Sequence, residues 1–285
     1  MPDQAPAPAL DPAFDRYAVF GNPIAHSKSP FIHARFAEAA AQAMRYEALL
    51  APIAGFAQAV ADFRAAGGRG ANVTVPFKLE AFALADTRSA RAEAAGAANT
   101  LLISEAGIHA DNTDGIGLVR DLAWLGAPIA GRRVLLLGAG GAARGAILPL
   151  LEAGPCELVV ANRTRAKAEE LAIRFSDAGP INAAGFDSLQ GSFDLVINAT
   201  SASLSDAAPP LPAGVYAAGA LAYDMMYGKT ETAFLTAARA LGANRLADGL
   251  GMLVEQAAES FTLWRGVRPD TAPVRQALRD MLAAS

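Results

Sequence analysis

The chain has 285 residues, of which 53% are hydrophobic and 18% charged, and its formal net charge at pH 7 is −4. This length favours two domains, and the composition is that of a folded, soluble protein rather than a disordered one. The small negative charge and the scattered cations argue against a nucleic acid or an anionic membrane as partner. A small anionic ligand would therefore need a local cationic site.

Residues 1–15 are expected to form a mobile tail. The first twelve contain four prolines and two aspartates, without the apolar core of a signal peptide. No apolar run reaches the roughly 18 residues that a membrane-spanning helix needs. Cys156 is the only cysteine, so no disulfide can form within the chain. We expect a cytoplasmic protein.

From Tyr17 onward, short apolar runs alternate with longer helical patterns, which predicts a β-α-β-α-β unit. Strands are expected at 17–20, 46–50 and 71–75, and helices at 30–41 and 55–66. Pro30 after Ser29 indicates a helix that has Ser29 as its N-cap. The loop 21–29 and the segment 74–78 then lie at the carboxyl ends of strands, where open parallel sheets bind ligands.

A second α/β region begins near Arg132 and predicts a dinucleotide-binding domain of the Rossmann type. A strand is expected at 133–137, followed by a glycine loop at 138–141 and a helix that runs to 151. A second strand is expected at 158–161 and a second helix at 164–175, and apolar runs follow at 194–199 and 220–225.

The phrase Asp114-Gly115-Ile116-Gly117 nearly recurs as Asp248-Gly249-Leu250-Gly251, which indicates two crossings between the domains. The predicted fold is thus α/β, with an N-terminal α/β substrate domain at 16–114 and a Rossmann-type cofactor domain at 115–251. Helices in 252–285 return to the first domain. The glycines that flank the crossings are hinge candidates; two unrelated glycine turns are the alternative.

The glycine loop fits the pattern G-x-G-x-x-G/A between an apolar strand and a helix. Gly138 allows a tight turn, Gly140 lets the backbone approach a pyrophosphate, and Ala143 permits close helix packing. The expected cofactor contacts are Gly138, Ala139, Gly140, Gly141 and Ala142.

The next strand ends in Asn162-Arg163-Thr164, without the acidic residue that usually binds the ribose of NAD. Arg163 and Lys167 can neutralise a ribose 2′-phosphate, and Thr164 can cap the following helix and donate a hydrogen bond. The sequence therefore favours NADP(H) over NAD as cofactor, with a solvated basic helix start as the alternative.

Seven motifs in order, from about Tyr17 to the end of the chain, resemble shikimate dehydrogenases of the shikimate/quinate dehydrogenase family. They are Gly21-Asn22-Pro23-Ile24-Ala25-His26-Ser27-Lys28-Ser29-Pro30, Gly70-Ala71-Asn72-Val73-Thr74-Val75-Pro76-Phe77-Lys78, Ala98-Asn99-Thr100, Asp111-Asn112-Thr113-Asp114-Gly115, Asn162-Arg163-Thr164, Tyr223-Asp224-Met225 and Asp248-Gly249-Leu250-Gly251-Met252-Leu253-Val254-Glu255-Gln256.

The resemblance implies an oxidoreductase that reduces 3-dehydroshikimate to shikimate with NADPH, in the pathway to chorismate and the aromatic amino acids. It implies that Lys78 and Asp114 are the catalytic pair. An ammonium at the carbonyl oxygen can donate the proton that hydride addition requires, and a carboxylate can keep it charged.

The resemblance also implies which residues contact the substrate and the cofactor. For the substrate carboxylate it implies Ser27, Ser29 and Tyr227, and for the hydroxyl groups Thr74, Asn99, Asp114 and Gln256. Beside the cofactor it implies Thr200, Met225 and Gly249. The chain departs from the family at Ser203, where relatives often have glycine, so the path of that cofactor loop is open.

Other interpretations remain at this stage. They are a quinate/shikimate dehydrogenase that uses NAD or both cofactors, a dehydrogenase of the methylenetetrahydrofolate type, and a non-catalytic NADP-binding regulator.

His26, His33 and His109 share no metal-ligand spacing, so we expect them to be structural or exposed and expect no metal. Asn72 is expected to support its loop. The expected partner is the small substrate alone, and the protein is a monomer or a homodimer.

Overall fold

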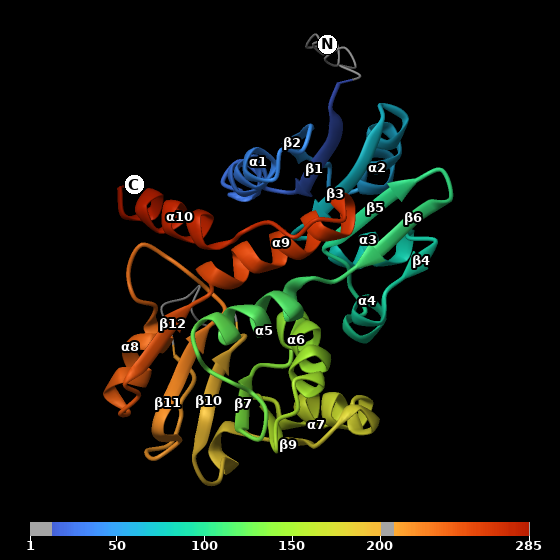
Figure 1. The fold of residues 1–285 in the computed structure, drawn as a ribbon. Coiled ribbons are helices and arrows are strands. Elements are labelled where there is room, and N and C mark those ends of the chain that lie inside the picture. Colours follow the sequence, from blue (N-terminus) through green and yellow to red (C-terminus); the bar gives the residue numbers. More distant parts are fainter. Residues whose placement is uncertain (1–12, 201–207, 285) are drawn as a thin grey trace.

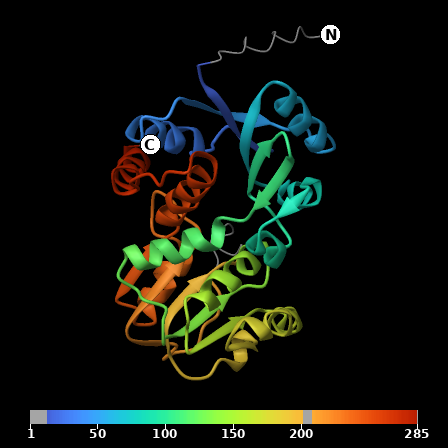
Figure 2. The same cartoon turned by 45° about the vertical axis from the view of Figure 1, so that its right-hand side comes forward.

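The computed structural model describes residues 13–200 and 208–284. These residues form two six-stranded sheets, each in its own lobe, and the long helix α9 (Leu250–Arg265) crosses between the lobes (Figure 1). The view in Figure 2, turned by 45°, shows the same separation of the lobes. Residues 1–12, most of the expected tail, and Ser203 lie outside the described residues.

The first sheet has the order β2-β1-β3-β5-β6-β4. Its strands are β1 (Asp15–Gly21), β2 (Met44–Leu50), β3 (Gly68–Val73), β4 (Thr87–Arg88), β5 (Thr100–Ser104) and β6 (Gly107–Asp111). Its helices are α1 (Ser29–Ala39), α2 (Phe56–Ala65), α3 (Lys78–Leu84) and α4 (Ala90–Ala95). The β-α-β-α-β prediction is confirmed, with end points shifted by at most three residues.

This sheet is mixed rather than parallel throughout. β1 is parallel to both β2 and β3, but β5 is antiparallel to both β3 and β6. The short turn between Ser104 and Gly107 joins β5 and β6 as a hairpin, and a tight hairpin can connect only antiparallel strands. The expected ligand crevice at the carboxyl ends of β1 and β3 is retained.

The prediction for the start of α1 is wrong by one residue. The helix begins at Ser29, and Lys28 is the N-cap, without a side-chain capping bond. Oγ of Ser27 accepts a hydrogen bond from the backbone N–H of Ser29 at 3.3 Å, so the acceptor comes from two residues upstream. The side chain of Ser29 therefore does not serve the helix end.

The second sheet is parallel throughout, with the order β9-β8-β7-β10-β11-β12. In chain order this is 3-2-1-4-5-6, the doubly wound dinucleotide-binding topology. The elements are α5 (Asp114–Trp124), β7 (Arg133–Leu137), α6 (Gly141–Glu152), β8 (Glu157–Ala161), α7 (Arg165–Arg174), β9 (Ile181–Ala184), β10 (Phe193–Asn198), β11 (Tyr216–Asp224), α8 (Ala233–Ala240) and β12 (Arg245–Asp248).

The central strand β7 shows why the sequence forms this sheet. Val134 and Leu136 pack with α5, α6 and α7, whereas Leu135 and Leu137 pack on the opposite face with α8. All four side chains are fully buried. A strand covered by helices on both faces reads as a continuous apolar run, as the sequence does here.

The C-terminal helices α9 and α10 (Ala272–Ala284) pack on the first sheet. Val254 and Phe261 of α9 and Leu278 of α10 share a buried cluster with Ile32 and Phe36 of α1. None of the helices in the described ranges is long and apolar enough to cross a membrane.

The recurring glycine phrase serves close packing. Gly115 and Gly117 lie inside α5, and Gly251 lies inside α9. A Cβ at Gly117 would approach the backbone nitrogen of Gln256 to 2.7 Å, so α5 and α9 can cross this closely only with glycine there. The hinge interpretation of these glycines stays a prediction.

Candidate active site

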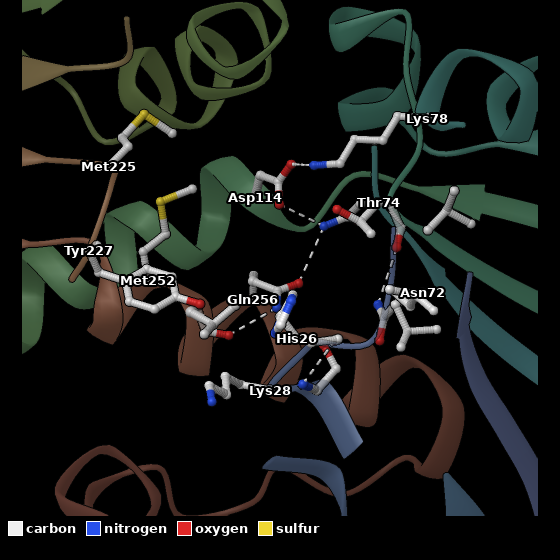
Figure 3. Close-up of a pocket in the computed structure, with 18 of the residues that line it drawn as sticks. His26, Lys28, Asn72, Thr74, Lys78, Asp114, Met225, Tyr227, Met252 and Gln256 are labelled. Carbon is white, nitrogen blue, oxygen red and sulfur yellow. Dashed lines mark hydrogen bonds and ion pairs between the residues drawn. The ribbon is translucent and has the colours of Figure 1, made fainter. Parts of the chain in front are cut away.

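The substrate residues expected from the sequence line one cavity of about 330 Å³. Its wall is formed by the loop before α1, the end of β3, the starts of α3 and α5, the segment after β11, and α9 (Figure 3). The structure brings together Ser27, Ser29, Thr74, Lys78, Asn99, Asp114, Tyr227 and Gln256.

Lys78 and Asp114 form an ion pair in this cavity. Nζ of Lys78 lies 2.5 Å from Oδ2 of Asp114, and the two side chains keep 32% and 20% of their surface exposed. Each is the first residue of its helix, α3 or α5. The neighbouring Phe77 is fully buried and stacks on Phe56 at 4.9 Å, which anchors the start of α3. Nζ of Lys78 is therefore accessible to a ligand and held in place.

Asn99 holds the second oxygen of Asp114. Its Nδ2 donates to Oδ1 of Asp114 at 2.8 Å and lies 3.3 Å from Oε1 of Gln256. Its Oδ1 accepts from the backbone N–H of Thr113 at 2.9 Å, which fixes the orientation of the amide. Asp114 thus accepts a hydrogen bond from an ammonium on one oxygen and from an amide on the other, and these two contacts fix the orientation of its carboxylate.

A buried hydrogen-bond network stands behind this group and is centred on Asn72. Nδ2 of Asn72 donates to Oγ of Ser260 at 2.9 Å and to Oγ1 of Thr100 at 3.1 Å. Its Oδ1 accepts from the hydroxyl of Tyr46 at 2.7 Å and lies 3.2 Å from Nε2 of His33. Asn72 lies in β3 rather than in a loop, and through these bonds it connects β3 with α1, β2, β5 and α9. It also lines the cavity.

The histidines differ in their surroundings. His33 is fully buried and stacked on Tyr46 at 4.2 Å, and this burial lowers its pKa to about 3. The ring is therefore neutral. His109 lies 2.9 Å from Oγ1 of Thr87, away from the cavity. His26, expected to be structural or exposed, is exposed and lines the cavity. The described residues contain no cluster suited to a metal ion.

One end of the cavity suits a carboxylate. Ser27, Lys28 and Ser29 at the start of α1 face it together with Tyr227. Burial, and next the charge of Asp248, raises the pKa of Tyr227, which keeps its hydroxyl protonated as a donor. Asp248 itself binds Arg279 through both oxygens at 2.6 and 2.8 Å, in line with a structural role.

A second cavity of about 660 Å³ lies where the strand order of the second sheet reverses, between the ends of β7 and β10. Gly138 has φ +107°, and a Cβ there would come within 3.1 Å of the carbonyl oxygen of Ala199, so the turn requires glycine. Of the expected cofactor residues, those lining this cavity are Gly138, Ala139, Gly140, Gly141, Ala142, Asn162, Arg163 and Thr200.

The geometry fits a phosphorylated dinucleotide. An added Cβ at Gly140 or Gly141 would meet no atom within 4 Å, so the backbone at the start of α6 is open to a ligand. Arg165 pairs with Glu169 at 2.8 Å, whereas Arg163 and Lys167 form no ion pair within the described part of the chain. Thr164 occupies the N-cap position of α7, as expected, but its side chain makes no capping bond. Thr164 and Lys167 do not line this cavity.

Met225 and Gly249 line the first cavity instead of the second. Oδ1 of Asp224 accepts from Nδ2 of Asn198 at 3.1 Å, and the N–H of Met225 donates to the carbonyl of Asn198 at 3.0 Å. The segments that carry Thr200 and Met225 are therefore tied together. The sequence reasoning missed several lining residues, namely Met252 in the first cavity and Phe186, Pro209 and Pro210 in the second.

A doubly wound sheet with a glycine loop at its switch point, joined to a second α/β lobe and accompanied by a Lys–Asp pair from α3 and α5, defines a two-domain α/β dehydrogenase of the nicotinamide-dinucleotide class. Family models narrow this class. Residues 19–101 match the shikimate dehydrogenase substrate binding domain, 123–205 match shikimate / quinate 5-dehydrogenase, and 249–279 match the shikimate 5′-dehydrogenase C-terminal domain.

The chain is also similar to known proteins and solved structures. The shikimate dehydrogenase (NADP(+)) of Aromatoleum aromaticum is 63% identical over 273 residues, which are 94% of this chain and 98% of that protein. The crystal structure of an Ael1 enzyme from Pseudomonas putida matches with a TM-score of 0.88 at 55% identity, covering 93% of this chain and 98% of that one. Shikimate 5-dehydrogenase from Thermus thermophilus, solved with NADP(H) and shikimate, matches with a TM-score of 0.81 at 35% identity over 94% and 100%. The chain belongs to the shikimate dehydrogenase family.

Proposed function

We propose that this protein catalyses the reversible, NADPH-dependent reduction of 3-dehydroshikimate to shikimate. The observation that carries the proposal is the Lys78–Asp114 ion pair, 2.5 Å long, in a cavity that also holds serine hydroxyls and a tyrosine hydroxyl suited to a carboxylate. Membership of the shikimate dehydrogenase family supports the same reaction.

Lys78 acts as the proton donor. Reduction of a ketone leaves negative charge on the carbonyl oxygen, and an ammonium beside that oxygen neutralises it by transferring a proton. Asp114 orients the ammonium of Lys78, and Asn99 fixes Asp114 in turn. In the reverse direction, the neutral amine accepts the proton of the alcohol. NADPH, when bound, supplies the hydride.

The remaining polar groups orient the substrate. Ser27, Ser29 and Tyr227 bind the carboxylate at one end of the cavity. Thr74, Asn99, Asp114 and Gln256 bind the hydroxyl groups, whose exchangeable donor and acceptor roles suit amides and a carboxylate. A substrate held at both ends presents its ketone to Lys78.

The cofactor residues follow from the second cavity. The start of α6, with Gly138, Ala139, Gly140, Gly141 and Ala142, receives the pyrophosphate, because its first N–H groups have no partner within the helix. Asn162, Arg163, Thr164 and Lys167 receive the adenosine ribose and its 2′-phosphate. Thr200, Met225 and Gly249 lie toward the nicotinamide.

We place the substrate domain at 16–114 and 252–285 and the NADP-binding domain at 115–251. The cytoplasm is the proposed location, and the functional unit is a monomer or a homodimer.

The test follows absorbance at the NADPH band with the purified protein. Shikimate and quinate are each added with NADP and with NAD, and Lys78→Ala serves as the inactive control. Rapid NADP reduction with shikimate alone supports the proposal. Preference for quinate or for NAD would assign the protein to the quinate/shikimate branch, and no reduction with any pair would overturn the dehydrogenase assignment.

A further inference from the structure

We infer that Lys28 is the cation that draws the substrate carboxylate into the cavity and sets the affinity for it, a specificity role separate from the catalysis by Lys78. The inference deepens the proposed function and rests on it. Lys28 lies between the two serines at the carboxylate end and lines the same cavity. It forms no ion pair and no side-chain hydrogen bond with any residue in 13–200 or 208–284.

The charges of the chain and of the cavity wall indicate why a free cation is needed to bind an anionic substrate. The chain carries a formal net charge of −4, so its overall field repels an anionic substrate. Asp114 is the only acidic residue among the described residues that line the cavity, and Lys78 neutralises it. The neighbouring Asp248 is bound by Arg279. Lys28 is thus the one uncompensated full charge in the described cavity wall at neutral pH, and its sign is opposite to that of a carboxylate.

The position of Lys28 fits this role. It is the N-cap residue of α1, an 11-residue helix whose positive end adds to the charge of the ammonium. Figure 3 shows Lys28 on the opposite side of the cavity from Lys78. Two cations at opposite ends can serve the two ends of one substrate, a carboxylate at Lys28 and a ketone at Lys78. A neutral residue at 28 would leave only neutral donors, namely Ser27, Ser29 and Tyr227.

Because Lys28 and Lys78 lie on opposite sides of the cavity, substitution of Lys28 can change substrate affinity without changing turnover. Lys28→Gln should raise the KM for shikimate, and its Kd by calorimetry, by about 5–20-fold, less than for a fully buried contact because Lys28 is partly exposed. Its kcat and its KM for NADP should stay within about twofold, because proton transfer and cofactor binding use other residues. Lys28→Arg should restore most of the affinity, and Lys28→Glu should weaken it further.

The matched control is Lys229→Gln, which removes the same charge from an exposed lysine that does not line the cavity. It should leave the KM for shikimate unchanged. Added NaCl should lower kcat/KM of the wild type more steeply than that of Lys28→Gln. Shikimate methyl ester, which lacks the negative charge, should bind both proteins equally.

The outcomes separate the two proposals. Binding of shikimate by the wild type without turnover would overturn the proposed function, and the calorimetric comparison would still decide the role of Lys28. Unchanged affinity in Lys28→Gln, or an equal loss for shikimate and its methyl ester, would overturn the role of Lys28 alone. No binding of shikimate to the wild type would overturn both.

Discussion

Asp114 receives Lys78 on one carboxylate oxygen, at 2.5 Å, and Asn99 on the other, at 2.8 Å. The three residues come from the starts of α3 and α5 and from the residue before β5, so their contact depends on how these elements meet. A lysine held this way keeps one orientation. The pair should therefore act as a unit in catalysis.

Single and double substitutions of Lys78 and Asp114 test whether the two residues act as a unit in catalysis. Lys78→Ala should lower kcat by about 10²–10⁴-fold, the usual contribution of general acid–base chemistry, with a smaller effect on the Kd for shikimate. Asp114→Asn should also slow turnover. The double variant should lose much less than the product of the two single losses, because each change already disables the pair. Stopped-flow rates and calorimetry measure both quantities; fully multiplicative losses would mean that the residues act separately.

Arg163 should read the 2′-phosphate of the cofactor. Arg163→Ala should weaken NADPH binding by about 1.5–3 kcal/mol, the scale of a charge-assisted hydrogen bond, and leave NADH binding nearly unchanged. Arg165→Ala is the control, since Arg165 sits two residues away but pairs with Glu169. Fluorescence titration with both cofactors measures the effect. An equal loss for NADPH and NADH in Arg163→Ala would make Arg163 structural.

The sequence predicted the elements whose pattern is local and strong. β7 spans 133–137 as expected, because four consecutive apolar residues and the glycine that ends the run leave little choice. The region 85–111 was not predicted in detail. It is rich in alanine and forms one short helix and three short strands, and neither a period of 3.6 nor one of 2 stands out in such a sequence.

The residues of the two cavities also fall into those that sequence motifs predicted and those that they did not. Residues carried by motifs, such as Ser27 and Thr74, line the expected cavity. Met252 was missed because only the packing of α9 decides which of its faces borders the cavity. Pro209 and Pro210 reach the second cavity from the segment after β10, whose path no sequence pattern sets. The roles of all these residues stay predictions.

A buried ion cluster joins α5, α9 and α10, and no motif indicated it. Arg275 binds Asp121 and also Glu255, the latter at 2.8 Å, and the hydroxyl of Tyr223 donates to Asp121 at 2.6 Å. Asp121 and Glu255 are 2% and 4% exposed. Arg275 is the only cation paired with Asp121 among the described residues, whereas Glu255 is also bound by Arg268 at 2.5 Å. Arg275→Ala leaves the buried Asp121 without its cation and Glu255 with Arg268 alone, and it should lower the free energy of unfolding by about 3–5 kcal/mol.

Arg279→Ala is the control for this prediction. Its guanidinium is half exposed in its pair with Asp248, so its loss should cost less than about 1 kcal/mol. Urea unfolding followed by circular dichroism measures both variants. Equal destabilisation by the two substitutions would show that burial does not set the strength of these pairs.

His33 should make the stability of the protein depend on pH. Its pKa is about 3 in the folded protein and 6.5 in the unfolded chain, so between these values the unfolded chain binds more protons. Stability from this group is then complete above pH 6.5 and falls as the pH is lowered, by about 1.4 kcal/mol per pH unit.

His33→Gln isolates the contribution, because the amide of glutamine can still donate to Oδ1 of Asn72 but cannot take up a proton. At pH 7 the variant should be less stable than the wild type, since it loses the stacking of the ring on Tyr46. Between pH 6.5 and 4.5 the difference should shrink by about 2–3 kcal/mol, because only the wild type must exclude a proton from its core on folding. Urea unfolding of both proteins at intervals across this range measures the difference. Parallel stability curves would mean that His33 is protonated in the folded state as readily as in the unfolded chain, and that its neutral, buried place beside Asn72 is wrong.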